Sequence, residues 1–83
     1  MPRWTITEAV ALPEGRLVLR FADGTRGTVT LLHSELTGAL IRLRDPAYFV
    51  QMRLLDGVPT WPQGEDLAPD GLYADVRQAQ AMA

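Results

Sequence analysis

The stretch Trp61–Tyr73 reads W-P-Q-G-E-D-L-A-P-D-G-L-Y, and it decides how the chain is organised. Pro62 has no backbone donor, so we expect the preceding strand to end there. Gly64 supplies a backbone position free of Cβ constraint, and either Asp66 or Ala68 stands where a helix needs its N-cap. The stretch is therefore predicted to be a specified turn that leads into a helix.

The predicted C-terminal helix begins at Pro69, whose φ angle is preset for a first helical turn. Asp70 lies in that turn, where its negative charge meets the positive end of the helix dipole. Leu72 and Val76 follow at four-residue spacing. They give the helix one thin apolar stripe that can pack against a sheet.

Length and composition are typical of a single globular domain. The 83 residues form one predicted domain, 1–83, in which 47% of the residues are hydrophobic. The chain has no cysteine, so neither a disulfide nor a thiolate metal site can form. We expect no cofactor.

Charge and hydropathy argue against nucleic acid and membranes as partners. All 8 basic residues are arginine, and the formal net charge is −2, which disfavours general affinity for nucleic acid. No apolar run approaches the length of a membrane span, and the N-terminus lacks the apolar segment of a signal peptide. We therefore expect a cytoplasmic protein.

The first strand is predicted from a two-residue alternation that has one exception. Its apolar positions are Trp4, Ile6, Val10 and Leu12. Glu8 falls on the same side as these residues. A β-bulge or a frayed early half explains Glu8 structurally, and the functional alternative is a buried acid with a raised pKa. The turn Pro13-Glu14-Gly15 then leads into a second strand, Arg16–Phe21.

The turn Ala22-Asp23-Gly24 determines which side chains share a face of the next hairpin. A two-residue loop would place Val29 on the face opposite Leu17 and Leu19, which splits the core. A three-residue loop with Gly24 in the left-handed conformation pairs Leu17 with Val29 and keeps the apolar side chains together. We therefore predict the three-residue loop.

The same register gathers three arginines on the reverse face of the hairpin. Arg16, Arg20 and Arg26 lie together on that face in the predicted register. Their planar donors can bind carboxylates or phosphates, whereas the structural alternative is an ordinary solvated face. These arginines are the best candidates in the sequence for a binding site.

The middle of the chain is predicted to contain a short helix and a second hairpin. Ser34 can cap a helix that carries three apolar residues at helical spacing, Leu36, Leu40 and Leu43. Asp45-Pro46 starts a turn, and Tyr48 and Phe49 lead into a strand over 50–54. Asp56-Gly57 closes the second hairpin, where the alternation fits an even and an odd loop equally well.

Three motifs, in this order, resemble the bacterial family called domain of unknown function twenty-four forty-two. They are F-A-D-G-T-R-G-T-V-T-L, L-R-D-P-A-Y-F and W-P-Q-G-E-D-L-A-P-D-G-L-Y, and the resemblance covers about residues 6–75. The closing motif is the specific part. Two positions depart from the family pattern: Thr30 stands where Asp is common and Gln63 where Asn is common, so any role of that Asp is absent here.

The resemblance implies a small α+β fold and no established activity. Members of the family are single small proteins or are fused to a helix-turn-helix region, and many are encoded beside another small protein in arrangements similar to toxin–antitoxin pairs. We interpret the motif residues as structural: Asp23, Gly24, Trp61, Pro62, Gly64, Asp66, Leu67, Pro69, Leu72 and Tyr73.

Two further groups of residues carry functional alternatives. His33 is the single histidine and could bind a metal only with scattered carboxylates; otherwise it is a strand-end or loop residue. Four carboxylates could do acid–base chemistry or hold a hard cation, or else cap the helix and face solvent: Glu65, Asp66, Asp70 and Asp75. No nucleophile stands in a recognised motif, so we expect neither a metal site nor an enzyme.

The functional hypothesis from the sequence is a non-enzymatic protein-interaction module. Trp61 and Tyr73 are assigned to the core, although they could also stack a ligand. The expected partner is another small protein, such as a neighbouring gene product for which this chain is the antitoxin-like or regulatory member. Docking would use an exposed strand edge or the arginine face. The alternatives are a homodimer formed through an edge strand and a weak nucleic-acid-binding protein that uses the same arginines.

Overall fold

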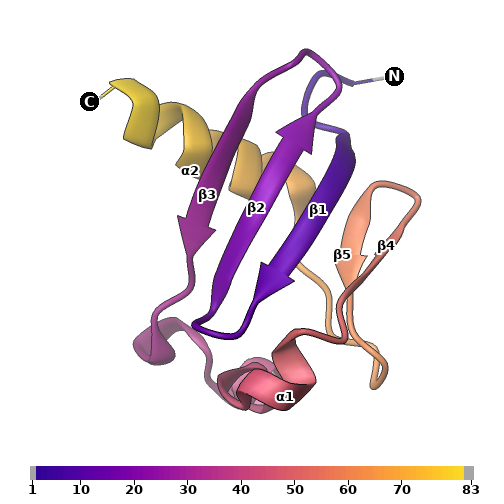
Figure 1. Ribbon diagram of the computed structural model, residues 1–83, viewed down its shortest axis with the longest axis vertical. Helices are drawn as coiled ribbons and strands as arrows, with labels where there is room; N and C mark the ends of the chain where they lie inside the picture. The colour runs from indigo at the N-terminus through magenta and orange to yellow at the C-terminus, as the bar shows by residue number, and fades with distance from the viewer. Residues whose placement is uncertain (1, 82–83) are drawn as a thin grey trace.

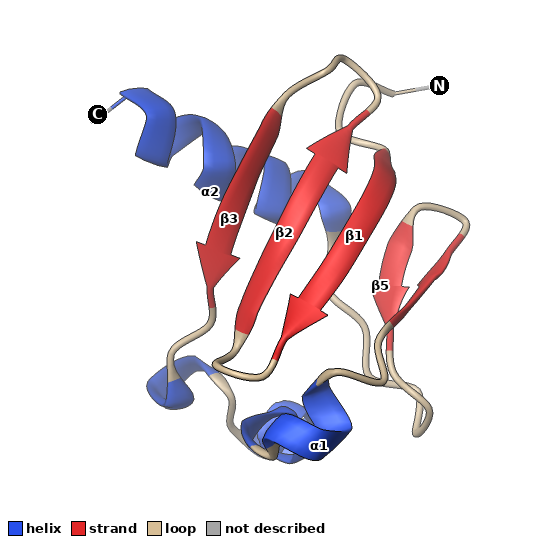
Figure 2. Ribbon diagram, in the orientation of Figure 1, coloured by secondary structure: helices blue, strands red, loops and turns tan. Residues whose placement is uncertain are grey.

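A three-stranded antiparallel sheet is the central element of the computed structural model, which describes residues 2–81 (Figure 1). Its strands lie in the order β1-β2-β3 and span Ile6–Leu12, Arg16–Phe21 and Arg26–Thr30. A second hairpin consists of β4 (Arg53–Leu55) and β5 (Val58–Thr60), and the helix α2 spans Pro69–Ala81. The predicted fold, α+β with a three-strand meander, a second hairpin, a short middle helix and a C-terminal helix, is confirmed (Figure 2), although the short α-helix spans Pro46–Phe49 and not the predicted positions 36–43.

The hairpin of β2 and β3 has the predicted register. Leu17 pairs with Val29 and Leu19 pairs with Gly27, as a three-residue loop requires. Gly24 has a φ angle of +88°, in the left-handed region that favours glycine. The apolar side chains of the two strands therefore share one buried face.

A β-bulge in β1 changes the face that this strand presents to the core. The register with β2 shifts between Ile6 and Glu8, so the residues after the shift have reversed orientation. Ile6 remains buried and Ala9 packs against the core, but Val10 is 56% exposed. Trp4 precedes β1 and is 43% exposed. The predicted core positions of Trp4, Val10 and Leu12 are therefore wrong, because Leu12 shares the outward face of Val10, and the bulge explanation of Glu8 is right.

The segment after β3 folds into short helical turns in place of the one predicted helix. They are the 3₁₀ helices η1 (His33–Glu35) and η2 (Gly38–Arg44) and the helix α1 (Pro46–Phe49). Gly38 has a φ angle of +57°, a left-handed value that interrupts the helical path. Ser34 lies inside η1 and does not cap it. Leu36 and Leu43 are nevertheless buried in the core, as their spacing suggested.

The strand predicted over 50–54 is shorter than expected because α1 precedes it. The Asp45 carboxylate accepts a hydrogen bond from the Ala47 N–H at 3.0 Å, and Pro46 occupies the first helical position. This capped start favours a helical turn through Phe49, so β4 begins only at Arg53.

The second hairpin closes with the even loop that the sequence left open. Leu55 pairs with Val58 across the two residues Asp56 and Gly57. Both loop residues have positive φ angles, 50° and 79°, as a tight hairpin of this kind requires.

The helix α2 lies behind the three-stranded sheet and leaves the opposite side of the sheet uncovered (Figure 1). Its predicted stripe is in place, because Leu72 and Val76 are both buried. The helix packs closely against β3 at Gly27, where an added Cβ would lie 2.5 Å from Val76 Cγ1. Neither α2 nor any other helix within residues 2–81 is long and apolar enough to cross a membrane.

Candidate functional site

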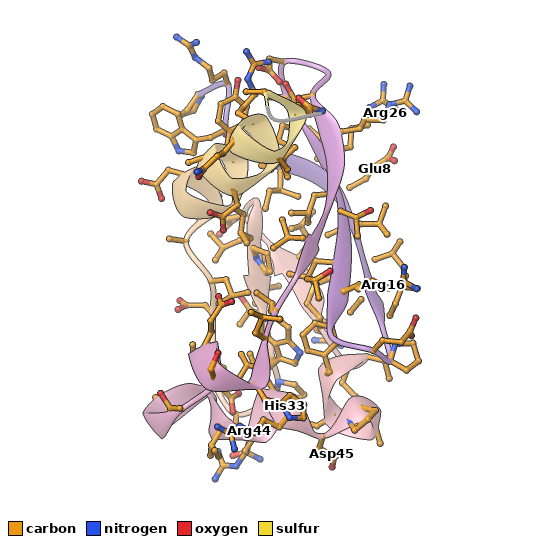
Figure 3. The ribbon with its side chains drawn as sticks, turned by 90° about the vertical axis from the view of Figure 1, so that its left-hand side faces the viewer. Glu8, Arg16, Arg26, His33, Arg44 and Asp45 are labelled. Atoms are coloured by element: carbon orange, nitrogen blue, oxygen red, sulfur yellow. The ribbon has the colours of Figure 1, made fainter. Side chains whose placement is uncertain are left out.

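The uncovered side of the sheet carries the three arginines that the sequence singled out. We call this surface the open sheet face; its outward-facing residues are Glu8, Val10, Leu12, Arg16, Val18, Arg20, Arg26, Thr28 and Thr30. In Figure 3, Glu8, Arg16 and Arg26 point away from the sheet on the side opposite α2. The structure therefore brings the predicted binding arginines onto one surface.

Arg20 lies between a like charge and an opposite charge on the neighbouring strands. It pairs with Arg26 across β2–β3 and with Glu8 across β1–β2. Like charges directly opposite each other destabilise a sheet, so the carboxylate of Glu8 compensates for this arrangement. Arg20 Nη1 lies 3.7 Å from Glu8 Oε1, and the Glu8 side chain is 71% exposed. The alternative that Glu8 is a buried acid is therefore wrong.

Arg16 is also accompanied by a carboxylate. Its guanidinium donates a hydrogen bond to Glu14 Oε1, and this bond lowers the pKa of Glu14 below its ordinary value. Three arginines beside two carboxylates make the face weakly cationic, less so than the β2–β3 hairpin alone suggested. The reason is that Glu8 comes from β1 and Glu14 from the β1–β2 turn, which the hairpin pattern does not include.

Two valines form the centre of the open sheet face. Val10 pairs directly with Val18 across β1–β2, and the two side chains are 56% and 41% exposed. A shallow pocket of about 200 Å³ adjoins them, lined by Glu8, Ala9, Val10, Val18, Leu19, Arg20 and Arg26. Sequence reasoning missed the role of Val10 because it placed this residue in the core. The signal that could have identified it was Glu8, whose misfit marks the bulge.

Trp61, the largest residue of the closing motif, lies in the core and is 2% exposed. Its indole N–H donates to the Phe49 carbonyl at 2.8 Å, and the centroids of the Trp61 and Phe49 rings lie 5.6 Å apart. A buried indole with a satisfied N–H leaves no surface on which a ligand could stack.

The neighbouring motif residues form the turn and the start of α2. Gly64 has a φ angle of +99°, and its N–H donates to the Trp61 carbonyl at 2.9 Å. The Leu67 N–H donates to the Pro59 carbonyl at 3.1 Å. Of the remaining members, Pro62 is exposed, Asp66 bridges to Thr60, Pro69 begins α2 and Leu72 is buried.

Asp23 and Tyr73 link the β2–β3 turn to α2. The Tyr73 hydroxyl donates to Asp23 Oδ2 at 2.6 Å, and the Thr25 N–H donates to Asp23 Oδ1 at 2.9 Å. These two bonds, that of Tyr73 first, lower the pKa of Asp23 from 3.8 to about 2. The ring of Tyr73 also packs edge-on against Phe21, with centroids 5.1 Å apart. Asp23 and Tyr73 thus connect the β2–β3 turn to α2, as a structural role requires.

A polar cluster at the closing motif has no counterpart in the sequence-based interpretation. The Tyr48 hydroxyl donates to Glu65 Oε1 at 2.6 Å and accepts from the Gln63 N–H at 2.8 Å. The Glu65 side chain is 4% exposed, and Arg42 Nη1 lies 3.7 Å from its Oε2. No residue in the described range donates a hydrogen bond to this buried Oε2. The sequence gives no local signal for the cluster because Tyr48 and Glu65 are 17 positions apart.

The environment of Glu65 keeps it ionised. The hydrogen bond from Tyr48 lowers the pKa of Glu65, burial opposes this effect, and the charge of Arg42 lowers the pKa further. Burial and the same hydrogen bond raise the pKa of Tyr48. The cluster thus links α1, η2 and the closing turn through one carboxylate.

The four carboxylates grouped in the sequence do not form one site. Glu65 is buried against Tyr48, Asp70 lies in the first turn of α2, and Asp75 faces β3. Across residues 2–81, no three His, Cys, Asp or Glu side chains gather as a metal site would require. His33 lies in η1, at the rim of a pocket of about 350 Å³, and its carbonyl accepts a hydrogen bond from Arg44 at 2.9 Å.

Of the comparisons with known proteins, only the one with protein families gave a match. No match was found among curated proteins or among solved structures. The family model described as "protein of unknown function (DUF2442)" matches residues 6–78, which is most of the chain. This match agrees with the resemblance carried by the three motifs, and the chain belongs to this family.

Proposed function

We propose that this chain is a non-enzymatic protein-binding module that contacts its partner through the open sheet face. One observation carries the proposal: the face is uncovered, and the exposed pair Val10 and Val18 lies among Arg16, Arg20 and Arg26. Protein interfaces commonly combine an apolar centre with a polar rim, and arginine is enriched in them. The matching partner surface has an apolar centre with carboxylates around it.

The partner in this proposal is another small protein in the cytoplasm, encoded by a neighbouring gene. The chain then acts as the antitoxin-like or regulatory member of the pair. This choice of partner rests on the gene arrangements that the resemblance described above implies, and the chain belongs to that family. The non-enzymatic part of the proposal rests on the sequence, in which no nucleophile stands in a recognised motif.

Co-expression with the neighbouring gene product tests the proposal, with complex formation measured by size-exclusion chromatography. We expect the two proteins to elute together and Val18→Glu to separate them, because a charge in the apolar centre is desolvated on binding. Val50→Glu is the matched control, since Val50 is 43% exposed, close to the 41% of Val18, and lies off the sheet. Separate elution of the two wild-type proteins, or equal disruption by both variants, would overturn the proposal.

Binding of nucleic acid by the same arginines is the competing outcome. Two of the three arginines already have carboxylate neighbours, so a phosphate would compete with Glu8 and Glu14. We expect no binding of single-stranded oligonucleotides at low salt. Salt-sensitive binding that Arg20→Glu abolishes would favour the nucleic-acid alternative over the protein partner.

A further inference from the structure

The outer edge of β3 is a strand edge with unpaired backbone groups. Within the described part of the chain, β3 pairs with β2 and with no other strand. The Phe21 N–H donates to the Thr25 carbonyl, and the Leu31 N–H donates to the Gly15 carbonyl. Residues of an antiparallel strand alternate between bonding to a neighbour and facing away from it. The N–H and C=O groups of Thr28 and Thr30 therefore face outward.

One backbone group at this edge is already occupied. Gln80 Nε2, from the last part of α2, donates to the Arg26 carbonyl at 2.7 Å. Native proteins commonly protect strand edges in this way against pairing with other chains. The protection ends at Arg26, and the remaining half of β3 has a row of four outward-facing groups from Thr28 and Thr30.

A groove with two carboxylates runs along this unprotected half. It has a volume of about 270 Å³ and is lined by Thr28, Val29, Thr30, Glu35, Asp75 and Ala79. In Figure 1, η1 follows the end of β3 and α2 passes behind the strand, so the groove lies between these two elements. Glu35 and Asp75 are exposed, and neither forms an ion pair with a basic side chain of residues 2–81.

We propose that the edge of β3 binds an extended segment of another protein that has lysine or arginine at alternate positions. The segment adds a fourth strand through the backbone groups of Thr28 and Thr30. Every second side chain of such a strand points toward the α2 layer, because side chains alternate across a sheet. There a basic side chain meets Asp75 and Glu35. This site uses the backbone edge of β3 and the groove beside α2, whereas the open sheet face uses side chains on the opposite side of the sheet. The proposal does not depend on the partner proposed for that face.

The charges favour this occupant over a second copy of the chain. If two β3 edges paired about a two-fold axis, α2 of each copy would lie beside α2 of the other, with the groove carboxylates of both copies in one interface. Asp75 and Glu35 would then meet carboxylates of the same sign, which is unfavourable. A basic strand neutralises the same two residues.

Titration of labelled protein with a capped eight-residue peptide of alternating threonine and lysine tests the proposal. Binding of the peptide is measured by the changes in the NMR chemical shifts of the protein's backbone amides. We expect the amides of Thr28 and Thr30 to shift most, and a peptide of alternating threonine and glutamate to bind at least tenfold more weakly. Equal binding of the two peptides, or shifts confined to the β1 and β2 residues of the open sheet face, would overturn the proposal.

Three variants measure separately how much backbone pairing and the groove carboxylates contribute to binding of the peptide. Thr28→Pro removes an outward N–H and leaves the bonds to β2 intact, so it should abolish binding, whereas Thr28→Val should retain it. The double variant Glu35→Lys and Asp75→Lys should reverse the preference toward the glutamate peptide, and this test does not depend on the fold of the proline variant. Unchanged preference in the double variant would contradict the proposal.

Matched controls on α2 complete the experiment. Gln78→Lys makes the same single-charge change as Asp75→Asn but lies outside the groove, so only Asp75→Asn should weaken binding of the lysine peptide several-fold. Gln80→Ala frees the Arg26 carbonyl and should strengthen binding. Concentration-dependent dimerisation that Thr28→Pro removes would show that the occupant is a second copy, and would overturn our choice of partner.

Discussion

Two arginine–glutamate pairs in this molecule have the same separation and different surroundings. Arg20 Nη1 lies 3.7 Å from Glu8 Oε1 on the open sheet face, and Arg42 Nη1 lies 3.7 Å from Glu65 Oε2 beside the closing turn. The side chain of Glu8 is 71% exposed and that of Glu65 is 4% exposed. Water screens the first pair, so its charges remain available to a partner. Burial makes the second carboxylate depend on its few neighbours.

The difference extends to the residues around each pair. Val10 and Val18 lie exposed beside the sheet pair, whereas the buried Glu65 is held by the Tyr48 hydroxyl and by the backbone N–H of Trp61, which donates to its carbonyl. We infer that the closing motif mainly stabilises the fold and that the open sheet face mainly binds. Substitutions in the closing motif should therefore lower the free energy of unfolding strongly, whereas substitutions on the open sheet face should change it only slightly.

The largest expected effect on stability comes from Trp61→Ala. Removing a buried tryptophan costs about 3–5 kcal/mol, through lost burial and the cavity that remains. The matched control is Trp4→Ala. Because Trp4 is 43% exposed, this substitution should lower the free energy of unfolding by less than about 1 kcal/mol. Urea unfolding of both variants measures the difference. Similar costs for the two tryptophans would contradict the structural role of the closing motif.

Tyr48→Phe should have the next largest effect. It removes the donor to Glu65 Oε1 and leaves an ionised, buried carboxylate with only Arg42 nearby. We expect the melting temperature to fall by roughly 4–8 °C. The double variant Tyr48→Phe and Glu65→Leu should recover part of the loss, because an apolar replacement removes the unsatisfied charge as well. No recovery would show that the hydroxyl acts mainly through Gln63.

The buried pair should also make stability depend on acid pH. The pKa of Glu65 is lowered from 4.5 in the folded protein, so its contribution is present above about pH 4.5 and is lost as the pH falls. Asp23 behaves in the same way between its ordinary pKa of 3.8 and its folded value of about 2. Thermal melts between pH 7 and pH 2 should show a smaller loss for Glu65→Gln than for the wild type. An identical loss would assign the acid sensitivity to other groups.

The sequence was sufficient for the meander because its constraints are local. Strict alternation in β2 and β3, together with one glycine turn, allowed a single register that keeps Leu17 and Leu19 with Val29. In β1 the same alternation failed, since a bulge reverses the face of every residue after it. The valine centre of the open sheet face was therefore not foreseen, although the three arginines were.

The middle segment and the buried cluster required tertiary information. Leu36 and Leu43 have helical spacing, but a left-handed Gly38 lies between them, and the two leucines reach the core from separate turns. Tyr48 and Phe49 fit the start of a strand as well as a helical turn, and only the Asp45 cap favours the helical turn. The Tyr48–Glu65 bond joins distant segments, so no periodicity could reveal it.

Glu8→Gln should have the smallest effect on stability and the clearest effect on binding. An exposed ion pair contributes little, so the free energy of unfolding should change by no more than about 0.5 kcal/mol. The variant leaves Arg20 opposite Arg26 without compensation, and this repulsion should weaken as salt is added. The same uncompensated charge should speed association with a partner that carries carboxylates, most strongly at low salt. Stopped-flow association rates beside thermal melts test both statements, and a slower association would contradict the assignment of this face to an acidic partner.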